Sequence, residues 1–260
     1  MLDYLTLILA AAAAGLAGLG LHKARRIHLK LFDLDRLVQE RVDNLYTQLT
    51  TLNRLERTLS LPGALPPTRG WAGSPDFLRH VHDLARAHRP RTVVECSSGT
   101  STIVLARTLQ MSGTAGHVHS LEHDPLYASK TRDALQEFDL SSLATVIDAP
   151  LVSHVIDGQQ HRWYRLDDLP GGIDMLVIDG PPVNTQRMAR YPALPLLIDR
   201  LSPGALVVLD DAARPDERAA VDQWVQRFGL VRLEGHFAEK GIAVLQRPAH
   251  PSGTPGPETT

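Results

Sequence analysis

Two short stretches, TVVECSSGTST at residues 92–102 and HVHSLE at residues 117–122, decide the fold of this chain. Each contains a β-branched run that predicts a buried strand, at 92–95 and at 117–122. A turn of small residues follows the first run, and a helical pattern over 102–111 separates it from the second. Strand, helix and strand in this order predict neighbouring parallel strands covered by helices.

The same alternation continues to about residue 247 and predicts an α/β fold, a doubly wound parallel sheet with an antiparallel last strand. Further strands are expected at 144–148, 173–179 and 205–210, helices at 125–138 and 215–228, and a closing antiparallel pair at 231–237 and 241–246. In such sheets ligands bind beyond the carboxyl ends of the strands. Five of these ends carry an acid: Glu95, Glu122, Asp148, Asp179 and Asp210.

The first turn distinguishes between cofactors. A dinucleotide fingerprint needs G-x-G-x-x-G, so that a pyrophosphate can rest on the helix N-terminus, and this turn has only Gly99. An NAD-dependent oxidoreductase is therefore disfavoured. Glu122, at the end of the next strand, can accept hydrogen bonds from both hydroxyls of a ribose. The turn and Glu122 together predict a nucleoside site.

With these motifs the sequence resembles the class I S-adenosylmethionine-dependent methyltransferases, and within them a bacterial branch with a Glu-x-Gly-Ser-Gly-x-Ser-Thr first turn. The resemblance implies a Rossmann-like methyltransferase sheet. Ser97 departs from it, because the family usually has its first glycine there, and a serine fits only if the backbone angle suits a Cβ. The motifs run in order: VVECSSGTSTIVLA (93–106), SLEHDP (120–125), DAPL (148–151), RWYRL (162–166), IDMLVIDGPP (173–182), ARYPALPLL (189–197), LVVLDDAARPDE (206–217) and KGIAVL (240–245).

The resemblance also implies S-adenosylmethionine as the cofactor and assigns residues to its parts. Glu95 would meet the methionine amino group, and Glu122 would take the ribose hydroxyls. Asp148 and Ala149 would flank the adenine, and Asp179 would face the methionine end and the acceptor. The cofactor-binding residues implied are Glu95, Ser97, Gly99, Ser101, Glu122, His123, Asp148, Ala149 and Asp179.

Methyl transfer to oxygen also requires the acceptor to lose a proton. The sulfonium already activates the methyl group, so the enzyme must hold the nucleophile at about 3 to 3.5 Å, in line with the S–C bond. A general base, with Asp179 as the candidate catalytic residue, would remove the proton, or a divalent cation would lower the pKa of the acceptor hydroxyl. Asp179, Asp210 and Asp211 resemble the set that holds magnesium in catechol-type O-methyltransferases. Those enzymes place a lysine just after the fourth-strand acid, whereas Gly180 follows here; the acids alternatively cap the next helix.

Other polar side chains near the motifs have two interpretations each. His123 packs against the adenine or the ribose rim, or acts in catalysis. Arg190 and Tyr191 contact the acceptor, or lie on a helix surface. The remaining histidines are scattered, with His154 and His161 expected in loops.

Residues 4–21 (YLTLILAAAAAGLAGLGL) form a run without a charge. It is barely long enough to span a bilayer core of about 30 Å. Only Asp3 precedes the run, which favours a retained anchor over a cleaved segment or a buried helix. Because basic residues prefer the cytoplasmic side, we expect a single-pass membrane protein with a cytoplasmic catalytic domain. The basic residues that follow the run are Lys23, Arg25, Arg26 and Lys30.

A seven-residue apolar spacing follows and predicts a helical stalk. The stalk pairs with a second copy as a coiled-coil homodimer, or it packs as an amphipathic helix on its own domain. The predicted organisation is a transmembrane anchor (1–22), the stalk (23–61), a methyltransferase domain (62–247) and a disordered tail (248–260). The apolar positions are Leu31, Val38, Leu45, Leu52 and Leu59, with Val42 and Leu49 four residues after two of them.

The composition limits the classes of partner that the chain is expected to bind. With 27 Lys+Arg against 29 Asp+Glu the formal charge is −2, and no basic stripe is present, so nucleic acid is not expected to bind. The single cysteine, Cys96, excludes an intramolecular disulfide. The sequence therefore predicts a membrane-anchored S-adenosylmethionine-dependent methyltransferase acting on oxygen of a small-molecule, glycan or lipid-linked acceptor. The alternative is a non-catalytic nucleoside-binding module on a coiled-coil membrane scaffold.

Overall fold

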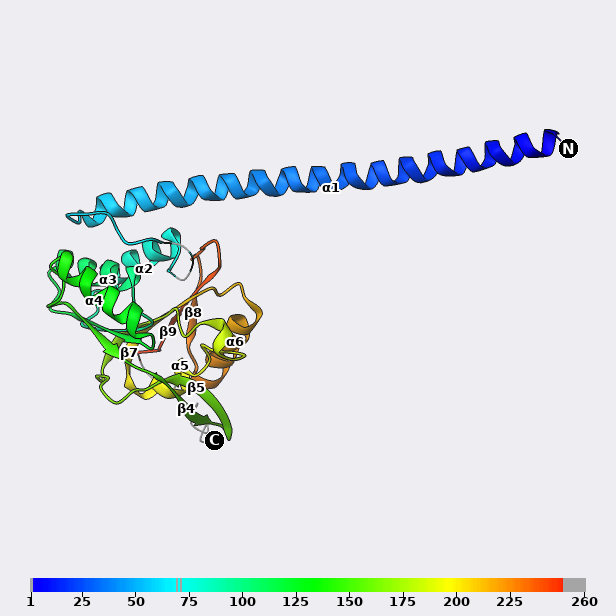
Figure 1. The fold of residues 1–260 in the computed structure, drawn as a ribbon. Helices are drawn as coiled ribbons and strands as arrows, with labels where there is room; N and C mark the ends of the chain where they lie inside the picture. Colours follow the sequence, from blue (N-terminus) through cyan, green and yellow to red (C-terminus); the bar gives the residue numbers. More distant parts are fainter. Residues whose placement is uncertain (1, 69, 71, 250–260) are drawn as a thin grey trace, which may run out of the picture. The chain divides into compact units, whose positions relative to one another are not determined.

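The structure is a computed structural model that describes residues 2–68, 70 and 72–249. It divides into two compact units that meet within one helix, α1 (Leu2–Leu59): the first ends at Leu49 and the second begins at Thr50. Figure 1 shows the elements of both. From residue 250 onward, the predicted disordered tail lies outside the described residues.

The first unit is helical throughout. An 18-residue window of α1 near its N-terminus has a mean hydropathy of 1.9 and is fully exposed, so the helix is long and apolar enough to cross a membrane. Further along α1, five residues of the predicted seam are also exposed: Leu31, Val38, Val42, Leu45 and Leu49. The pairing of this seam with a second copy stays a prediction.

The second unit is built on a seven-stranded sheet with the order β3-β2-β1-β6-β7-β9-β8. The first five strands in this order are parallel, and β9 runs antiparallel to both β7 and β8. The predicted α/β sheet with an antiparallel last strand is thereby confirmed. The strands are β1 (Thr92–Cys96), β2 (His117–Glu122), β3 (Ala144–Asp148), β6 (Ile173–Ile178), β7 (Leu201–Asp210), β8 (Val231–Leu233) and β9 (Ile242–Gln246).

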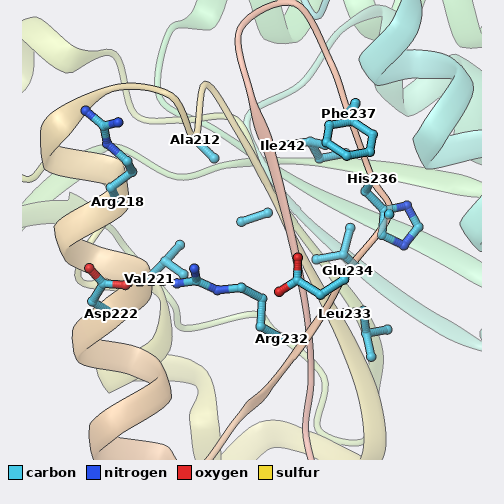
Figure 2. Close-up of a pocket in the computed structure, with 13 residues that line it drawn as sticks. Ala212, Arg218, Val221, Asp222, Arg232, Leu233, Glu234, His236, Phe237 and Ile242 are labelled. Atoms are coloured by element: carbon cyan, nitrogen blue, oxygen red, sulfur yellow. Dashed lines mark hydrogen bonds and ion pairs between the residues drawn. The ribbon is translucent and has the colours of Figure 1, made fainter.

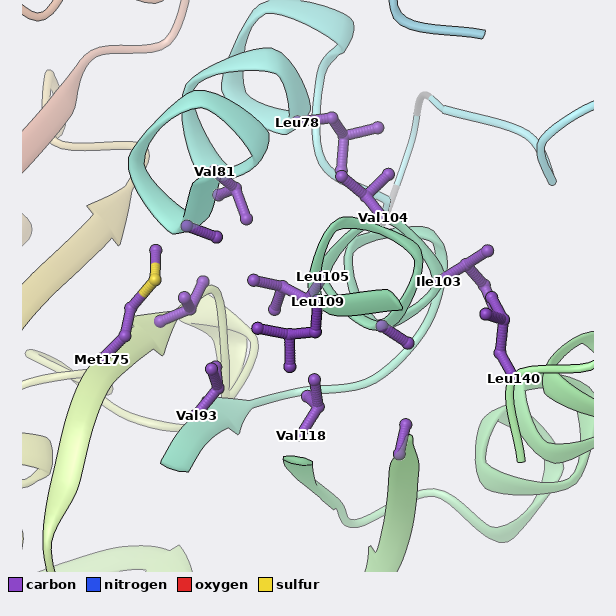
Figure 3. Close-up of a cluster of buried hydrophobic side chains, with 14 of the residues drawn as sticks. Leu78, Val81, Val93, Ile103, Val104, Leu105, Leu109, Val118, Leu140 and Met175 are labelled. Atoms are coloured by element: carbon purple, nitrogen blue, oxygen red, sulfur yellow. The ribbon is translucent and has the colours of Figure 1, made fainter. Parts of the chain in front are cut away.

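Helices cover both faces of the sheet because its strands are apolar on both. In β1, Val93 joins one buried cluster and Val94 the other, since successive side chains point to opposite faces. Figure 3 shows Leu105 and Leu109 over Val93 in the first cluster. That cluster includes residues of α2 (Pro75–His88), α3 (Thr100–Ser112) and α4 (Pro125–Glu137), and the other includes residues of α5 (Ala193–Leu197) and α6 (Pro215–Phe228).

The last turns of α1 belong to this core. Leu55 and Leu59 are fully buried in the cluster that also holds residues of α2 and α3. The Arg107 side chain donates hydrogen bonds to the carbonyl oxygens of Leu59 at 2.7 Å and Ser60 at 3.1 Å, which satisfies the end of the helix. The compact unit therefore begins at Thr50 rather than at 62, and packing on the domain is the correct alternative for these turns.

A hairpin that we did not predict lies apart from the main sheet. β4 (Leu151–Ile156) and β5 (Gln159–Tyr164) pair antiparallel and place His154 opposite His161. The expectation that both histidines lie in loops is therefore wrong. Asp157 and Gly158 connect the strands with positive φ angles of 51° and 76°, as a two-residue hairpin turn requires.

His82, in α2, is buried in a way that disfavours its charged form. Its Nδ1 lies 2.8 Å from Thr108 Oγ1, and because this hydroxyl donates to the Val104 carbonyl oxygen, the imidazole must be the donor. Nε2 is then unprotonated, and it has no hydrogen-bond partner among the described residues. Burial lowers the pKa of His82 below its ordinary value.

We expect this histidine to reduce stability in acid. The unfolded chain takes up a proton near pH 6.5 that the folded chain binds only at lower pH, so the free energy of unfolding falls as the pH decreases below 6.5. Urea denaturation at about pH 7.5 and about pH 5.5 should show a smaller decrease for His82→Leu than for the wild type. His88→Leu, at an exposed position of the same helix, is the control. Equal decreases in all three proteins would contradict the assignment.

Candidate functional site

A cavity of about 640 Å³ opens at the carboxyl ends of the parallel strands. Its wall includes the turn after β1, the end of β2, the segment after β6, the end of β7 and the loop before β9. Seven of the predicted site residues line it: Ser97, Gly99, Glu122, His123, Asp179, Asp210 and Asp211.

Four other predicted cofactor residues do not line the cavity. Glu95 is fully buried beneath the turn, and Ser101 and Ala149 are buried as well. Asp148 is 69% exposed and pairs with Arg132 at 2.8 Å. Asp148 ends its strand as predicted and Glu95 directly precedes the last residue of β1, whereas Ser101 lies in the first turn of α3 and not in the loop before it.

The first turn is held in a conformation that usually needs glycine. Ser97 has φ 135° and Gly99 has φ 141°, and both values lie in the region that side chains with a Cβ rarely adopt. The turn is fixed by hydrogen bonds from the Ser97 amide to the Leu121 carbonyl oxygen at 3.1 Å and from the Gly99 amide to Thr102 Oγ1 at 3.0 Å. The serine therefore adopts a glycine-like backbone geometry at the cost of backbone strain.

Ser97→Gly should relieve this strain. We expect the free energy of unfolding to rise by about 1 kcal/mol, because the relief of about 1–3 kcal/mol exceeds the extra entropy of glycine in the unfolded chain. Ser98→Gly is the matched control, since it deletes a hydroxyl that donates to Glu122 and should lower stability. Chemical denaturation measures both, and a less stable Ser97→Gly would argue against strain at this position.

Glu95 supports the turn from below. Its Oε2 accepts hydrogen bonds from Thr102 Oγ1 at 2.6 Å and Ser120 Oγ at 2.7 Å. Oε1 has no hydrogen-bond partner among the described residues. Burial raises the pKa of this carboxyl above its ordinary value, and Glu95 is a structural anchor of the turn.

Glu122 joins the two turns that border the cavity. Its Oε2 accepts from the Ser98 amide at 3.1 Å and the Ser98 hydroxyl at 2.9 Å. Its Oε1 accepts from the amides of His123 at 2.8 Å and Asp124 at 2.9 Å. Burial raises the pKa of Glu122, but hydrogen bonds from His123, Asp124 and Ser98 outweigh it and hold the pKa below its ordinary value. An ionised acceptor therefore faces the cavity at neutral pH.

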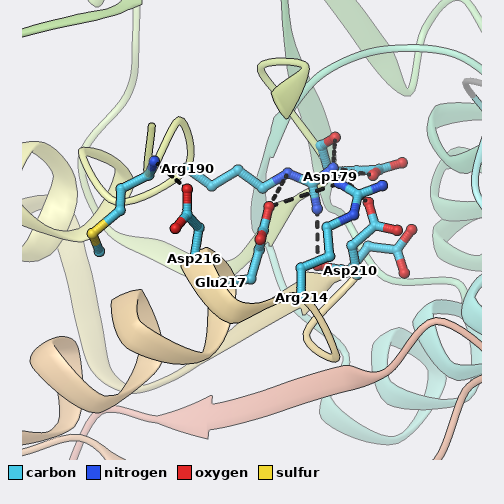
Figure 4. Close-up of polar contacts among 8 residues, drawn as sticks. Asp179, Arg190, Asp210, Arg214, Asp216 and Glu217 are labelled. Carbon is cyan, nitrogen blue, oxygen red and sulfur yellow. Dashed lines mark hydrogen bonds and ion pairs between the residues drawn. The ribbon is translucent and has the colours of Figure 1, made fainter. Parts of the chain in front are cut away.

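On the other side of the cavity, acids lie around the buried Arg190, and Figure 4 shows Asp179, Asp210 and Glu217 among them. Arg190 Nη2 lies 3.1 Å from Asp179 Oδ1 and 2.8 Å from Asp211 Oδ2, and Nη1 donates to the Asp210 carbonyl oxygen at 2.8 Å. Burial raises the pKa of Asp179 to about 6, and burial with the neighbouring acids Asp179 and Asp211 raises that of Asp210 to about 8. Both carboxyls are therefore weaker acids than exposed aspartates.

A comparison with protein-family models gives a match that includes most of this site. A family model described as a methyltransferase domain matches residues 94–212, the segment that carries the first turn, Glu122 and the acids of β6 and β7. This match supports the resemblance to class I methyltransferases that the sequence indicated. A sequence comparison of the whole chain with curated proteins gives no match.

Solved structures are similar to the methyltransferase domain in fold. PaMTH1, a methyltransferase from Podospora anserina bound to S-adenosylhomocysteine, is 15% identical, with a TM-score of 0.51 over 76% of this chain and 87% of that chain. The O-methyltransferase TomG from Streptomyces achromogenes, in complex with S-adenosylmethionine, is 19% identical, with a TM-score of 0.50 over 81% and 98%. An O-methyltransferase from Bacillus cereus, in complex with S-adenosylhomocysteine, is 16% identical, with a TM-score of 0.50 over 79% and 97%. At these identities the likeness shows the fold.

Three acids at the cavity lie close together, as a magnesium site would require, but their positively charged neighbours do not fit a magnesium ion. Oxygens of Asp179, Asp210 and Asp211 lie within 4.8 Å of one another. However, the guanidinium of Arg190 already contacts two of the three carboxylates, and Arg214 Nη1 contacts Asp211 Oδ2 at 2.9 Å. A divalent ion would meet these fixed positive charges, so the predicted magnesium site is not supported.

The structure corrects the helix-surface interpretation of Arg190 and Tyr191. Arg190 is 4% exposed and lines the cavity, so it does not lie on a helix surface. Tyr191 is 8% exposed; its hydroxyl accepts from Arg227 at 3.2 Å and its carbonyl oxygen from Trp224 at 3.0 Å. Tyr191 is therefore a core residue and not a cavity residue.

Two further cavity residues were not assigned a role from the sequence. Tyr164, from β5, and Lys240, from the loop before β9, both line the cavity. Both lie in motifs that carry the family resemblance, RWYRL and KGIAVL. Lys240 supplies a positive charge that acts to lower the pKa of Asp179, although no lysine follows this acid in the sequence.

A second cavity of about 330 Å³ lies between α6 and the β8–β9 edge of the seven-stranded sheet (Figure 2). Its wall includes Arg232 and Asp222, which form an ion pair at 2.9 Å. None of the five strand-end acids lines it. The larger cavity is therefore the candidate active site.

Proposed function

We propose that the chain is an S-adenosylmethionine-dependent methyltransferase that methylates an oxygen of its acceptor. The observation that carries the proposal is the larger cavity, in which the first turn and the ionised Glu122 face Asp179 from the neighbouring strand β6. The match of residues 94–212 to a methyltransferase domain supports the reaction. The O-methyltransferases among the similar folds support oxygen as the acceptor atom.

Residues on one side of the cavity bind the cofactor, and residues on the other side act on the acceptor. When bound, the cofactor supplies a methyl group already activated on a positively charged sulfur. Glu122 is positioned to accept hydrogen bonds from the ribose hydroxyls, with the first turn close enough for backbone contacts. Asp179 is the group that takes the acceptor proton, because its carboxylate lines the cavity, is held there by Arg190, and has a pKa that burial raises above its ordinary value.

Calorimetry with S-adenosylmethionine, S-adenosylhomocysteine and NAD tests the cofactor assignment. We expect the first two to bind at one site per chain and NAD not to bind. If NAD alone binds, the protein is an oxidoreductase. If none of the three ligands binds, the remaining interpretation is a membrane scaffold without a cofactor. Transfer of a labelled methyl group to small-molecule, glycan or lipid extracts then separates an enzyme from a non-catalytic nucleoside-binding module.

We further propose that α1 anchors the chain in a membrane, with the catalytic domain on the cytoplasmic side and a small-molecule, glycan or lipid-linked acceptor. The exposed apolar start of α1 and the basic residues after it support this orientation.

Expressed in bacteria, the full chain should sediment with membranes and resist extraction by high salt. A chain that begins at Thr50 should be soluble and folded, because it keeps the buried Leu55 and Leu59. A chain that begins at Ser60 is the contrasting case and should be less stable. A full-length protein that stays in the soluble fraction would refute the anchor.

A further inference from the structure

Arg190 is the only basic residue among the described cavity residues that is itself buried, at 4% exposure. It comes from the segment between β6 and α5, and its guanidinium reaches the ends of both β6 and β7. Nη2 also donates to the Asp179 carbonyl oxygen at 2.7 Å. A buried guanidinium is stable only when it is paired and hydrogen-bonded, and this one contacts two carboxylates and two carbonyl oxygens.

The position of the Arg190 Nη2 atom shows how the guanidinium neutralises the neighbouring acids. Nη2 contacts an oxygen of Asp179 and an oxygen of Asp211 at the same time, so it lies between the two carboxylates that a bridging cation would join. Figure 4 shows the arginine side chain extending along Glu217 to this point. Nε lies 4.0 Å from Glu217 Oε1, and Arg214 Nη1 adds a second contact to Asp211, at 2.9 Å.

We propose that Arg190 is the resident cation of this site, and that it positions Asp179 and Asp211 in place of a divalent metal ion. The guanidinium offers a fixed, planar set of donors that remain charged at all physiological pH values. It therefore holds the Asp179 carboxylate toward the cavity without a metal cofactor. Arg190 acts on the reaction through Asp179 and is a positioning residue.

Binding of Mn²⁺, a paramagnetic substitute for Mg²⁺, tests this inference without any methyl acceptor. We expect the full chain in a non-ionic detergent to bind no more Mn²⁺, by electron paramagnetic resonance, than the Asp210→Asn variant does. Arg190→Met leaves the three acids without their cation and should gain one Mn²⁺ site per chain. The double variant Arg190→Met/Asp210→Asn should lose that site again.

Two results would overturn the proposal. One is a stoichiometric Mn²⁺ site in the wild type that Asp210→Asn removes. The other is an Arg190→Met protein that is folded by circular dichroism yet binds no more Mn²⁺ than the wild type. If Arg190→Met does not fold, the comparison of the wild type with Asp210→Asn decides alone, and Arg190→Lys, which keeps a positive charge, should bind no Mn²⁺.

The inference rests on the proposed function only for the role of Asp179. An experiment can therefore contradict either one without contradicting the other. Binding of S-adenosylhomocysteine, measured on the same samples, reports on the cofactor site. Its absence in the wild type would remove the proposed function and leave the Mn²⁺ result standing. With an acceptor in hand, a chelator should leave wild-type turnover unchanged.

Discussion

Gly180→Ala is expected to abolish S-adenosylhomocysteine binding and to destabilise the domain by about 1–3 kcal/mol, the usual cost of overpacking a core. A Cβ at Gly180 would lie 2.2 Å from the Tyr164 hydroxyl oxygen, 3.0 Å from the Cys96 carbonyl oxygen and 3.3 Å from Ser97 Cβ. Tyr164 is 1% exposed, so its ring is held by its neighbours, and the Cys96 carbonyl oxygen belongs to the backbone of the turn. The strain must therefore pass to the turn after β1, which borders the cofactor side of the cavity. Chemical denaturation and calorimetry measure the two effects.

Two controls separate this clash from a general effect of alanine. Gly171→Ala should be neutral, because a Cβ there meets nothing within 4 Å. The double variant Gly180→Ala/Tyr164→Phe removes the nearest atom and should regain part of the lost stability. A Gly180→Ala protein with wild-type stability and affinity would show that the turn and Tyr164 yield more easily than their burial implies.

Glu122→Ala should weaken S-adenosylhomocysteine binding about 30-fold, because charge-assisted hydrogen bonds to a ligand are worth about 1.5–3 kcal/mol. The same change leaves the amides of Ser98, His123 and Asp124 without their acceptor. We therefore also expect a lower free energy of unfolding. Calorimetry on protein shown to be folded by circular dichroism isolates the loss of affinity.

Asp124→Ala provides the matched control for stability. Asp124 caps α4 through a 2.9 Å hydrogen bond from the Leu126 amide, so its loss should cost about 1 kcal/mol of stability. It leaves the Glu122 carboxylate in place and should keep most of the affinity. If Glu122→Ala binds as tightly as the wild type, the ribose assignment is wrong.

Local patterns in the sequence determined most of the sheet. The β-branched runs at 92–95 and 117–122 and the small-residue turn between them depend on neighbours within a few residues, so they report β1, β2 and the turn directly. Because parallel strands bring their carboxyl ends to one edge, the same patterns placed Glu122, Asp179 and Asp210 around one cavity. The β4–β5 hairpin could also have been predicted, since Asp157-Gly158 is a strong turn signal.

Tertiary structure alone decided the contacts between distant segments. The spacing of Leu52 and Leu59 is the same as that of Leu31 and Val38, yet only packing on α2 and α3 buries the end of α1. The positive φ of Ser97 is imposed by its surroundings, because a serine prefers other backbone angles. Lys240 enters the cavity from a loop far from Asp179 in the sequence, and Arg190 enters it from the segment between β6 and α5. A carboxylate pattern by itself leaves open which cation neutralises it, because a metal ion and a guanidinium satisfy the same oxygens; the fold determined that Arg190 reaches them.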